Sequence, residues 1–239
     1  MKAFLLAAGF GTRLKPLTDI TPKCLVPIAG QPLLFWWFQL LERHGVTEVL
    51  INTHYLFGQV RQYINYYNKK GKLYVHEFYE PVLLGSGGTV AANKSFVSKE
   101  ESFLICYADN LTDVNIGSMI EFHNSHDGIL TMALFHANNP KQCGIAQVDK
   151  NRKIVEFIEK PQNPTSNLAN AGIYAARKEI FDFFPNRKFI DFGNDILPQL
   201  AGHMYGWEIQ DYLIDIGTLE NYEKAKLDWS SKKIMYGVY

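Results

Sequence analysis

Hydrophobic and polar positions follow two different patterns along the chain, and the first of them fills its first half. Short apolar runs typical of buried strands are followed there by stretches with the spacing of amphipathic helices. The predicted strands are Ala3–Ala8, Glu48–Asn52, Leu73–Phe78 and Phe103–Cys106. The predicted helices are Leu33–Arg43, Phe57–Asn68, Gly88–Lys94 and Ile116–His126. Strands that alternate with helices favour a parallel sheet covered on both faces.

The second half of the chain is richer in strands. We expect strands at Ile129–Phe135, Cys143–Val148, Ile154–Ile158 and Ala171–Ala175, and helices at Lys178–Phe183, Asn194–Leu200 and Thr218–Trp229. No repeat, low-complexity tract or linker separates the two halves. The sequence therefore predicts an α/β protein with a single Rossmann-like, three-layer domain over residues 1–239, built on a mixed, mostly parallel central sheet.

Composition narrows the classes of function. With 24 basic and 24 acidic residues the net charge is zero, which argues against nucleic acid as a partner. No apolar run approaches the ~20 residues of a membrane span, so we expect no membrane partner. The opening run is at the short end of the ~7–15 residues of a signal peptide's apolar core, and the three cysteines are far apart. These features favour a cytoplasmic protein with reduced thiols.

The first predicted strand leads directly into a loop that carries Gly9, Gly11, Arg13 and Lys23. Ligands of open α/β sheets bind at the carboxyl ends of strands, where glycines allow close backbone approach and cations neutralise phosphate. A surface turn with solvated cations is the simpler interpretation of the same residues. Leu14 occupies the sixth position of a G-x-G-x-x-G fingerprint, which excludes the dinucleotide motif, and no P-loop is present.

Over its whole length this opening segment resembles the signature of the sugar-1-phosphate nucleotidylyltransferases (NDP-sugar pyrophosphorylases), which runs G-x-G-T-R-L-x-P-L-T and then P-K. The matching residues are Gly9, Gly11, Thr12, Arg13, Leu14, Pro16, Leu17, Thr18, Pro22 and Lys23. Later segments are similar to further motifs of the family in the same order: Glu80–Gly88, Ala108-Asp109, Glu159-Lys160-Pro161, Asn170–Tyr174 and Asp215–Thr218. The resemblance is closest to short members like the mannose-1-phosphate guanylyltransferases. It implies the nucleotide-diphospho-sugar transferase fold, with a nucleotide-binding half at 1–127 and a sugar-phosphate-binding half at 128–239.

The resemblance implies the reaction NTP + sugar 1-phosphate → NDP-sugar + pyrophosphate, with Mg²⁺ as cofactor. Arg13 would stabilise the leaving pyrophosphate, Lys23 would hold the α- or sugar phosphate, and Asp109 and Asp215 would bind the metal. The nucleotide would contact Leu6, Ala8, Gly9, Gly11, Thr12, Glu80 and Gly85. The sugar phosphate would contact Gly144, Glu159, Lys160 and Asn170.

Each of these later residues also has a simpler interpretation. Asp109 could be a turn or cap residue, Glu159-Lys160 an exposed turn, and Asn170 a polar residue of an edge strand. Asp215 could cap the last helix, although Thr218 fits that role better. We expect His123 and His126 to lie on the surface.

Glu80 bears on which base is used. Many thymidylyl- and uridylyl-transferring relatives carry Gln-Pro where this chain has Glu80-Pro81, and a carboxylate can accept from both guanine N1–H and the 2-amino group. This favours GTP with mannose 1-phosphate or a manno-heptose 1-phosphate. Some short uridylyltransferases also carry Glu at this position, so a uridylyl or thymidylyl donor remains open. Ala108 and Asn110 depart from the family pattern; Ala108 is a small change, whereas Asn110 could alter the contacts to the acceptor sugar.

Two other functions are compatible with the same motifs: a cytidylyltransferase acting on a non-sugar phosphate such as phosphocholine, and a non-catalytic, nucleotide-sensing subunit. The intact Arg13, Lys23, Asp109 and Asp215 argue against the second. We expect neither an appended β-helix nor a second catalytic domain. The aromatic segment Ile234–Tyr239 either packs against a partner subunit in a homodimer or is frayed.

Overall fold

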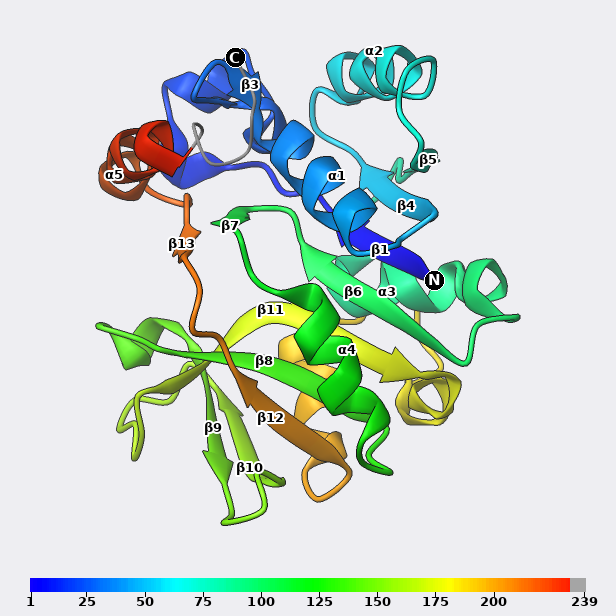
Figure 1. Ribbon diagram of the computed structural model, residues 1–239, viewed down its shortest axis with the longest axis vertical. Helices are drawn as coiled ribbons and strands as arrows, with labels where there is room; N and C mark the ends of the chain where they lie inside the picture. Colours follow the sequence, from blue (N-terminus) through cyan, green and yellow to red (C-terminus); the bar gives the residue numbers. More distant parts are fainter. Residues whose placement is uncertain (233–239) are drawn as a thin grey trace.

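Four parallel strands form the N-terminal side of a nine-stranded mixed sheet in the computed structural model, which describes residues 1–232 (Figure 1). They lie in the order β5 (Tyr74–Tyr79), β4 (Glu48–Thr53), β1 (Lys2–Leu6) and β6 (Ser102–Tyr107). Each predicted strand of the first half is present, with its ends shifted by at most two residues. Because the strands are parallel, their carboxyl ends share one edge of the sheet.

The other side of the sheet is built around β11 (Leu168–Arg177), which pairs antiparallel with β6. Its far edge pairs with β8 (Leu130–His136) and, at one position, with β9 (Gly144–Val148), to which β10 (Ile154–Glu159) is antiparallel. A register shift between Asn170 and Tyr174 marks the point where β11 bends. The strand β12 (Met204–Glu208), which the sequence pattern did not predict, pairs parallel with β8.

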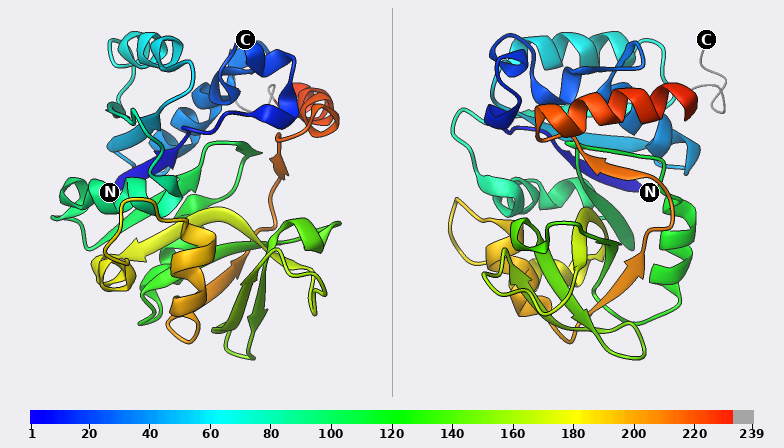
Figure 2. Two further views of the ribbon diagram at one scale, coloured as in Figure 1. Left: turned by 180° about the vertical axis from the view of Figure 1, so that it is seen from behind. Right: turned by 90° about the vertical axis from the view of Figure 1, so that its left-hand side faces the viewer.

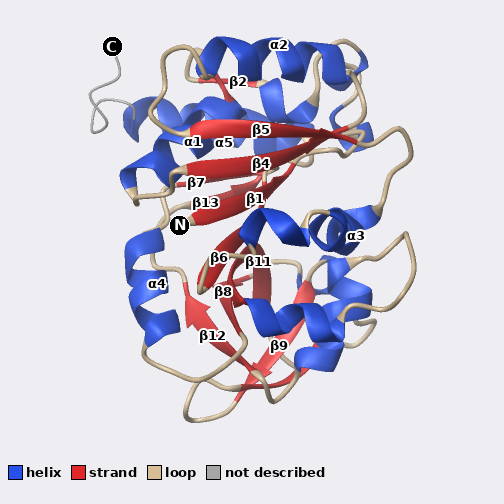
Figure 3. Cartoon of the chain, turned by 90° about the vertical axis from the view of Figure 1, so that its right-hand side faces the viewer, coloured by secondary structure: helices blue, strands red, loops and turns tan. Residues whose placement is uncertain are grey.

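Helices cover both faces of this sheet, as predicted. One face carries α1 (Leu33–Arg43), α2 (Phe57–Tyr67), α4 (Ile116–Asn124) and α5 (Leu219–Lys232). The other carries α3 (Gly85–Ala92) and the short helical turns Lys94–Val97, Lys178–Phe183 and Phe192–Leu200. Figure 3 shows α4 and α3 on opposite sides of the strands. Successive residues of β1 divide between the two cores, Ala3 and Leu5 facing one and Phe4 the other.

Two small sheets lie outside the main one. The first pairs β2 (Pro27–Ile28) with β3 (Gln31–Pro32), and the second pairs β7 (Asn110–Thr112) with β13 (Leu213–Asp215). Through β13 the chain returns to its N-terminal half, where α5 lies beside the segment that follows β1 (Figure 2). The Tyr222 hydroxyl of α5 donates to the Pro27 carbonyl at 2.9 Å. The last predicted helix therefore packs on the first half of the molecule.

Three details differ from the sequence-based expectations or lie beyond them. His123 is fully buried, so the expectation that it lies on the surface is wrong. The predicted helix Asn194–Leu200 is a π turn, Phe192–Ile196, followed by a 3₁₀ turn, Leu197–Leu200. The aromatic segment 234–239 lies outside the described residues, so its proposed role in a homodimer stays a prediction.

Candidate active site

The glycine-bearing loop leaves the carboxyl end of β1 and is folded back on itself. Gly11 has a φ of +64°, and a Cβ atom there would lie 2.9 Å from Thr18 Cγ2 and 3.2 Å from Lys23 Cβ. The buried Thr18 hydroxyl donates to the Gly11 carbonyl at 2.8 Å. Except for Glu80 and Gly85, the predicted nucleotide contacts lie along this segment: Leu6 ends β1, Ala8 is 7% exposed, and Gly9 and Thr12 are exposed.

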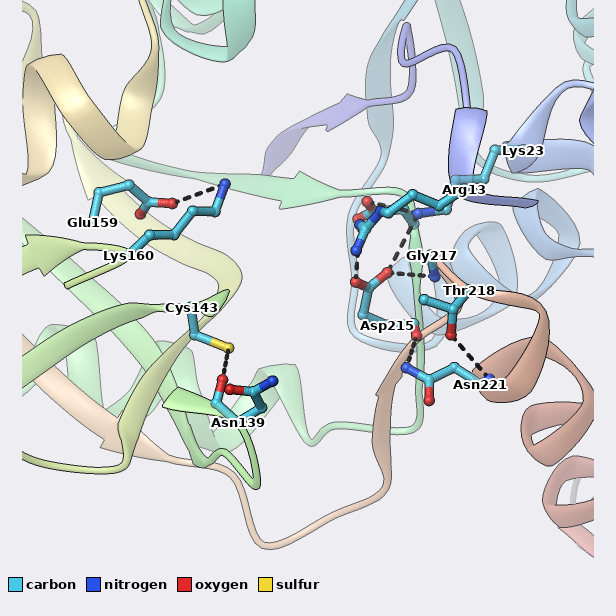
Figure 4. A network of polar contacts seen from close by, with 11 residues as sticks. Arg13, Lys23, Asn139, Cys143, Glu159, Lys160, Asp215, Gly217, Thr218 and Asn221 are labelled. Carbon is cyan, nitrogen blue, oxygen red and sulfur yellow. Dashed lines mark hydrogen bonds and ion pairs between the residues drawn. The ribbon is translucent and has the colours of Figure 1, made fainter. Parts of the chain in front are cut away.

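Lys23 lies between two carboxylates that are far apart in sequence. Its Nζ donates to Asp109 Oδ2 at 3.0 Å and to Asp215 Oδ1 at 3.3 Å. Arg13 extends toward the same group, with its guanidinium 3.7 Å from Asp215 Oδ2 (Figure 4). The Lys23 side chain is 11% exposed, whereas those of Asp109 and Asp215 are 42% and 47% exposed. The four residues expected to be catalytic thus form one cluster of two cations and two anions.

The small β7–β13 sheet brings Asp109 and Asp215 together. Asp109 directly precedes β7, Asp215 is the last residue of β13, and the Ile216 N–H donates to the Asp109 carbonyl at 3.1 Å. Asp215 Oδ1 also accepts from the Gly217 N–H at 2.7 Å, which fixes the carboxylate. Thr218 has the capping role expected of it, since its hydroxyl accepts from the Asn221 N–H at 3.2 Å.

The residues expected to bind the sugar phosphate come from the other half of the molecule: Gly144 begins β9, Glu159 ends β10, Lys160 follows β10 and Asn170 lies in β11. Lys160 is exposed and has a φ of +47°, a conformation that non-glycine residues seldom adopt, and its Nζ lies 3.6 Å from Glu159 Oε1. Burial raises the pKa of Glu159, Asp191 adds to the shift, and Lys160 opposes it. A Cβ at Gly144 or at Gly193 would lie 2.6 or 2.8 Å from Glu159 Oε2, so this carboxylate fills the space beside both glycines.

Cys143 lies on the same side of the site as Glu159 and Lys160, beside the Asn139 carbonyl (Figure 4). Burial raises the pKa of its thiol, and the carboxylates of Asp215 and Glu159 raise it further. Figure 4 shows Glu159 and Lys160 across from the cluster of Arg13, Lys23 and Asp215, with Cys143 on the side of the former pair. The fold therefore places the predicted nucleotide and sugar-phosphate residues in one region.

Asn170 is half-buried and both ends of its amide are occupied. Its Oδ1 accepts from the Gly172 N–H at 2.9 Å, and its Nδ2 donates to the Tyr174 hydroxyl at 2.6 Å. The side chain is therefore held in place at the bend of β11. Its predicted contact to a sugar stays a prediction.

Glu80 requires a correction. Its residue is 1% exposed, and both carboxylate oxygens accept hydrogen bonds from the protein: Oε1 from Asn52 Nδ2 and the Thr89 hydroxyl, Oε2 from the Leu84 N–H. Geometry gives this carboxylate no open edge with which to accept from a base. The burial of Glu80 could not be predicted from the sequence, because the donors from Asn52, Thr89 and Leu84 come together around its carboxylate only in the folded structure.

Two further residues have structural explanations. A Cβ on Gly85, one of the predicted nucleotide-binding residues, would collide with the Ile190 carbonyl. A glycine is therefore required at this position because the 188–192 segment packs closely against it. Asn110, which departs from the family pattern, is 7% exposed and donates from Nδ2 to the Ala171 carbonyl at 2.9 Å. It joins β7 to β11 next to Asn170, and its expected influence on the sugar contacts stays a prediction.

The donor set around Lys23 fits Mg²⁺. This ion is held by one or two carboxylates together with phosphate oxygens, and Asp109 and Asp215 supply two neighbouring, half-exposed carboxylates. Among residues 1–232 no three His, Cys, Asp or Glu side chains converge to hold a metal ion by themselves. Phosphate oxygens of the substrate and water molecules would supply the remaining ligands of a bound Mg²⁺.

Sequence reasoning missed two residues in this region. Asn52 is 5% exposed and lies near the end of a buried strand beside the glycine loop, a position at which a polar residue is itself a signal. Asp191, whose carboxylate raises the pKa of Glu159, lies in a segment without a recognisable motif.

Within the part of the chain that the structure describes, no helix is long and apolar enough to cross a bilayer.

A Rossmann-like sheet with a glycine loop at the end of β1, beside two cations and two carboxylates, is typical of nucleotide-binding α/β proteins. Its family is shown by a model described as "Nucleotidyl transferase", which matches residues 2–232. The chain belongs to this family.

Relatives and solved structures agree with this assignment. A mannose-1-phosphate guanylyltransferase catalytic subunit beta from Dictyostelium discoideum is 31% identical over 221 residues, covering 91% of this chain and 61% of that protein. HddC from Yersinia pseudotuberculosis, solved in complex with GMP-PN, superposes with a TM-score of 0.77 at 26% identity and covers 95% of this chain and 99% of its own. A Bacillus anthracis structure with the provisional name of a glucose-1-phosphate thymidylyltransferase has a TM-score of 0.87 at 24% identity, covers 96% of this chain and 95% of its own, and shows the fold alone. The chain spans about three fifths of the length of the curated relatives it matches, 61–62% for three of them.

Proposed function

We propose that this protein transfers a nucleotidyl group from a nucleoside triphosphate to a sugar 1-phosphate in the cytoplasm, releasing pyrophosphate. GTP is the proposed donor, and mannose 1-phosphate or a manno-heptose 1-phosphate is the proposed acceptor. The observation that carries the proposal is the cluster of Arg13, Lys23, Asp109 and Asp215, assembled from three separate segments and facing Glu159 and Lys160.

Phosphoryl chemistry of this kind requires positioning and charge neutralisation, with no protein nucleophile. The acceptor's phosphate oxygen attacks the α-phosphorus in line while pyrophosphate leaves. Arg13, which is 61% exposed, is free to reach the leaving pyrophosphate, and the more buried Lys23 is placed to hold the α- or sugar phosphate. Lys160 would bind the sugar phosphate from the opposite half.

Asp109 and Asp215 are the residues that would hold Mg²⁺. When bound, the ion would neutralise charge on the phosphate oxygens. Lys23 contacts both carboxylates, so the same lysine is within reach of any phosphate that the two aspartates bring near.

The proposal that GTP is the donor no longer rests on recognition of guanine by Glu80. With Glu80 buried, the support for GTP comes from relatives: the Dictyostelium guanylyltransferase, and HddC, whose structure contains GMP-PN.

Pyrophosphate release with Mg²⁺ tests the proposal directly. The four ribonucleoside triphosphates and dTTP are crossed with a panel of sugar 1-phosphates, with phosphocholine included. We expect GTP with mannose 1-phosphate or a manno-heptose 1-phosphate to give the highest rate. A productive UTP, dTTP or CTP pair would overturn the choice of base, and nucleotide binding without release by any pair would overturn the enzymatic function.

A further inference from the structure

A buried polar network lies behind the glycine loop and has no place in the chemistry described above. It consists of Asn52 near the end of β4, Glu80 after β5 and Thr89 in α3, which are 5%, 1% and 0% exposed. Buried polar and charged groups are costly unless all of them are hydrogen-bonded, so the partners of each atom decide what this network does.

Asn52 connects two segments that belong to the predicted nucleotide site. Its Oδ1 accepts from the Ala7 N–H at 2.7 Å, just where β1 passes into the glycine loop. Its Nδ2 donates to Glu80 Oε1 at 2.9 Å and to Thr89 Oγ1 at 3.0 Å. Only one orientation of the amide satisfies both sides, because Ala7 presents a donor and Glu80 presents acceptors.

Glu80 extends the network to the other flank of the site. Its Oε1 also accepts from the Thr89 hydroxyl at 2.5 Å, and its Oε2 accepts from the Leu84 N–H at 3.0 Å. Leu84 directly precedes α3, whose first turn carries Gly85. One chain of hydrogen bonds therefore runs from Ala7 through Asn52 and Glu80 to the start of α3.

We propose that Asn52 is a positioning residue for the nucleotide: with Glu80 as its partner, it holds the glycine loop and the start of α3 in one arrangement. The proposal rests on the proposed function, because it assumes that these two segments bind the nucleoside triphosphate. This positioning role differs from recognition of the base by Glu80, because a buried network that holds the site in place changes the affinity for all nucleotides alike.

The test exchanges the polarity of the pair. Asn52→Asp places two carboxylates side by side, and Glu80→Gln removes the charge from the carboxylate that Asn52 and Leu84 share. In the double variant N52D/E80Q, one oxygen of the new carboxylate at position 52 accepts from the Ala7 N–H, and the other accepts from the new amide nitrogen at position 80. The amide oxygen at position 80 then accepts from the Leu84 N–H. The two single variants each disturb the chain of hydrogen bonds, and the double variant restores it.

Equilibrium binding of GTP, UTP, CTP, ATP and dTTP with Mg²⁺ is measured by calorimetry on the full chain. The nucleotide that the wild type binds best should bind about tenfold or more weakly to N52D and to E80Q, and close to wild-type strength to N52D/E80Q. The ratio of GTP to UTP affinity should stay unchanged. Asn68→Asp is the matched control, because Asn68 bridges α2 to Val75 on β5 and should lose stability without losing nucleotide affinity.

Several results would overturn the inference. Near-normal nucleotide binding by N52D would remove the positioning role, and failure of N52D/E80Q to fold or to regain binding would contradict the coupling. A changed GTP to UTP ratio in E80Q would return Glu80 to base reading. Because binding is measured without turnover, the inference can fail while the proposed reaction stands, and pyrophosphate release decides the reaction separately.

Discussion

Lys23 and Arg13 divide the positive charge of the site between a fixed and an extended position. Lys23 is 11% exposed and held by two carboxylates, whereas Arg13 is 61% exposed and its guanidinium lies 3.7 Å from Asp215 Oδ2. Exposed pairs of this kind contribute only about 0–1 kcal/mol to stability. Arg13 is therefore a residue whose removal should affect chemistry far more than folding.

We predict that Arg13→Ala lowers kcat by about 10²–10³-fold, the loss typical of removing one group that stabilises charge in a transition state. Its thermal unfolding should resemble that of the wild type. Lys15→Ala is the control, because Lys15 lies two residues away, is 58% exposed and pairs only with Asp19 among the described residues. Pyrophosphate release and a melting curve on both variants provide the measurement. Full turnover by Arg13→Ala would show that the guanidinium has no part in the reaction.

For single residues, the sequence predicted the role of a side chain that acts through its own charge. It did not predict the role of a side chain that depends on which residues surround it in the fold. Arg13, Lys23, Asp109 and Asp215 were expected from the resemblance to the family's motifs, and the fold brings them together. Glu80 could not be assigned correctly, because burial by Asn52, Thr89 and Leu84 is a property of the tertiary structure.

Among the elements, α4 and the turn that follows it contact β8 through two histidines, His123 and His126, which both lie within hydrogen-bond distance of the Thr131 hydroxyl. His123 Nδ1 and His126 Nε2 lie 2.9 and 2.8 Å from Thr131 Oγ1, and Arg177 donates to the carbonyls of both histidines. Burial, then Arg177 and His126, lower the pKa of His123 to about 3. Burial and Arg177 lower the pKa of His126 to about 4, with Asp127 opposing.

We predict that the free energy of unfolding falls as the pH drops below about 6.5, the ordinary pKa of histidine. The unfolded chain binds protons there that the folded chain excludes, so stability is complete above pH 6.5 and is lost toward the folded pKa values. His123 alone should cost about 1 kcal/mol between pH 7 and pH 5.5. Urea unfolding at both pH values provides the measurement, with His123→Gln expected to flatten the dependence and His203→Gln, at an exposed site, to leave it unchanged. Equal pH dependence in all three proteins would refute the explanation.

The elements also show what local patterning can and cannot give. Helix α1 was predicted with both ends correct, because its apolar face repeats with helical spacing. Strands β7 and β13 are three residues each, too short for any periodicity, and exist only because they pair with each other. These two strands set the distance between Asp109 and Asp215, so the feature most important for the site was the one hidden from the sequence.

On the scale of the whole molecule, the chain crosses between its halves more than once to complete one site. β13 and α5 return to the N-terminal half and bring Asp215, while Glu159 and Lys160 remain on the opposite side (Figures 1 and 4). The division into a nucleotide-binding half at 1–127 and a sugar-phosphate-binding half at 128–239 stays a prediction, and Asp215 is the residue that crosses it.

The central claim is that the β7–β13 pairing creates the catalytic centre by uniting Asp109 with Asp215. Pyrophosphate release by Asp215→Asn, with the best substrate pair of the wild type, tests it most directly. Asp149→Asn is the control, since that carboxylate caps the turn between β9 and β10. We predict that Asp215→Asn loses about 10²–10³-fold in kcat while its fold is kept, and that the control keeps its turnover. Near-full turnover by a folded Asp215→Asn protein would contradict the account, because the carboxylate pair would then have no role in the reaction.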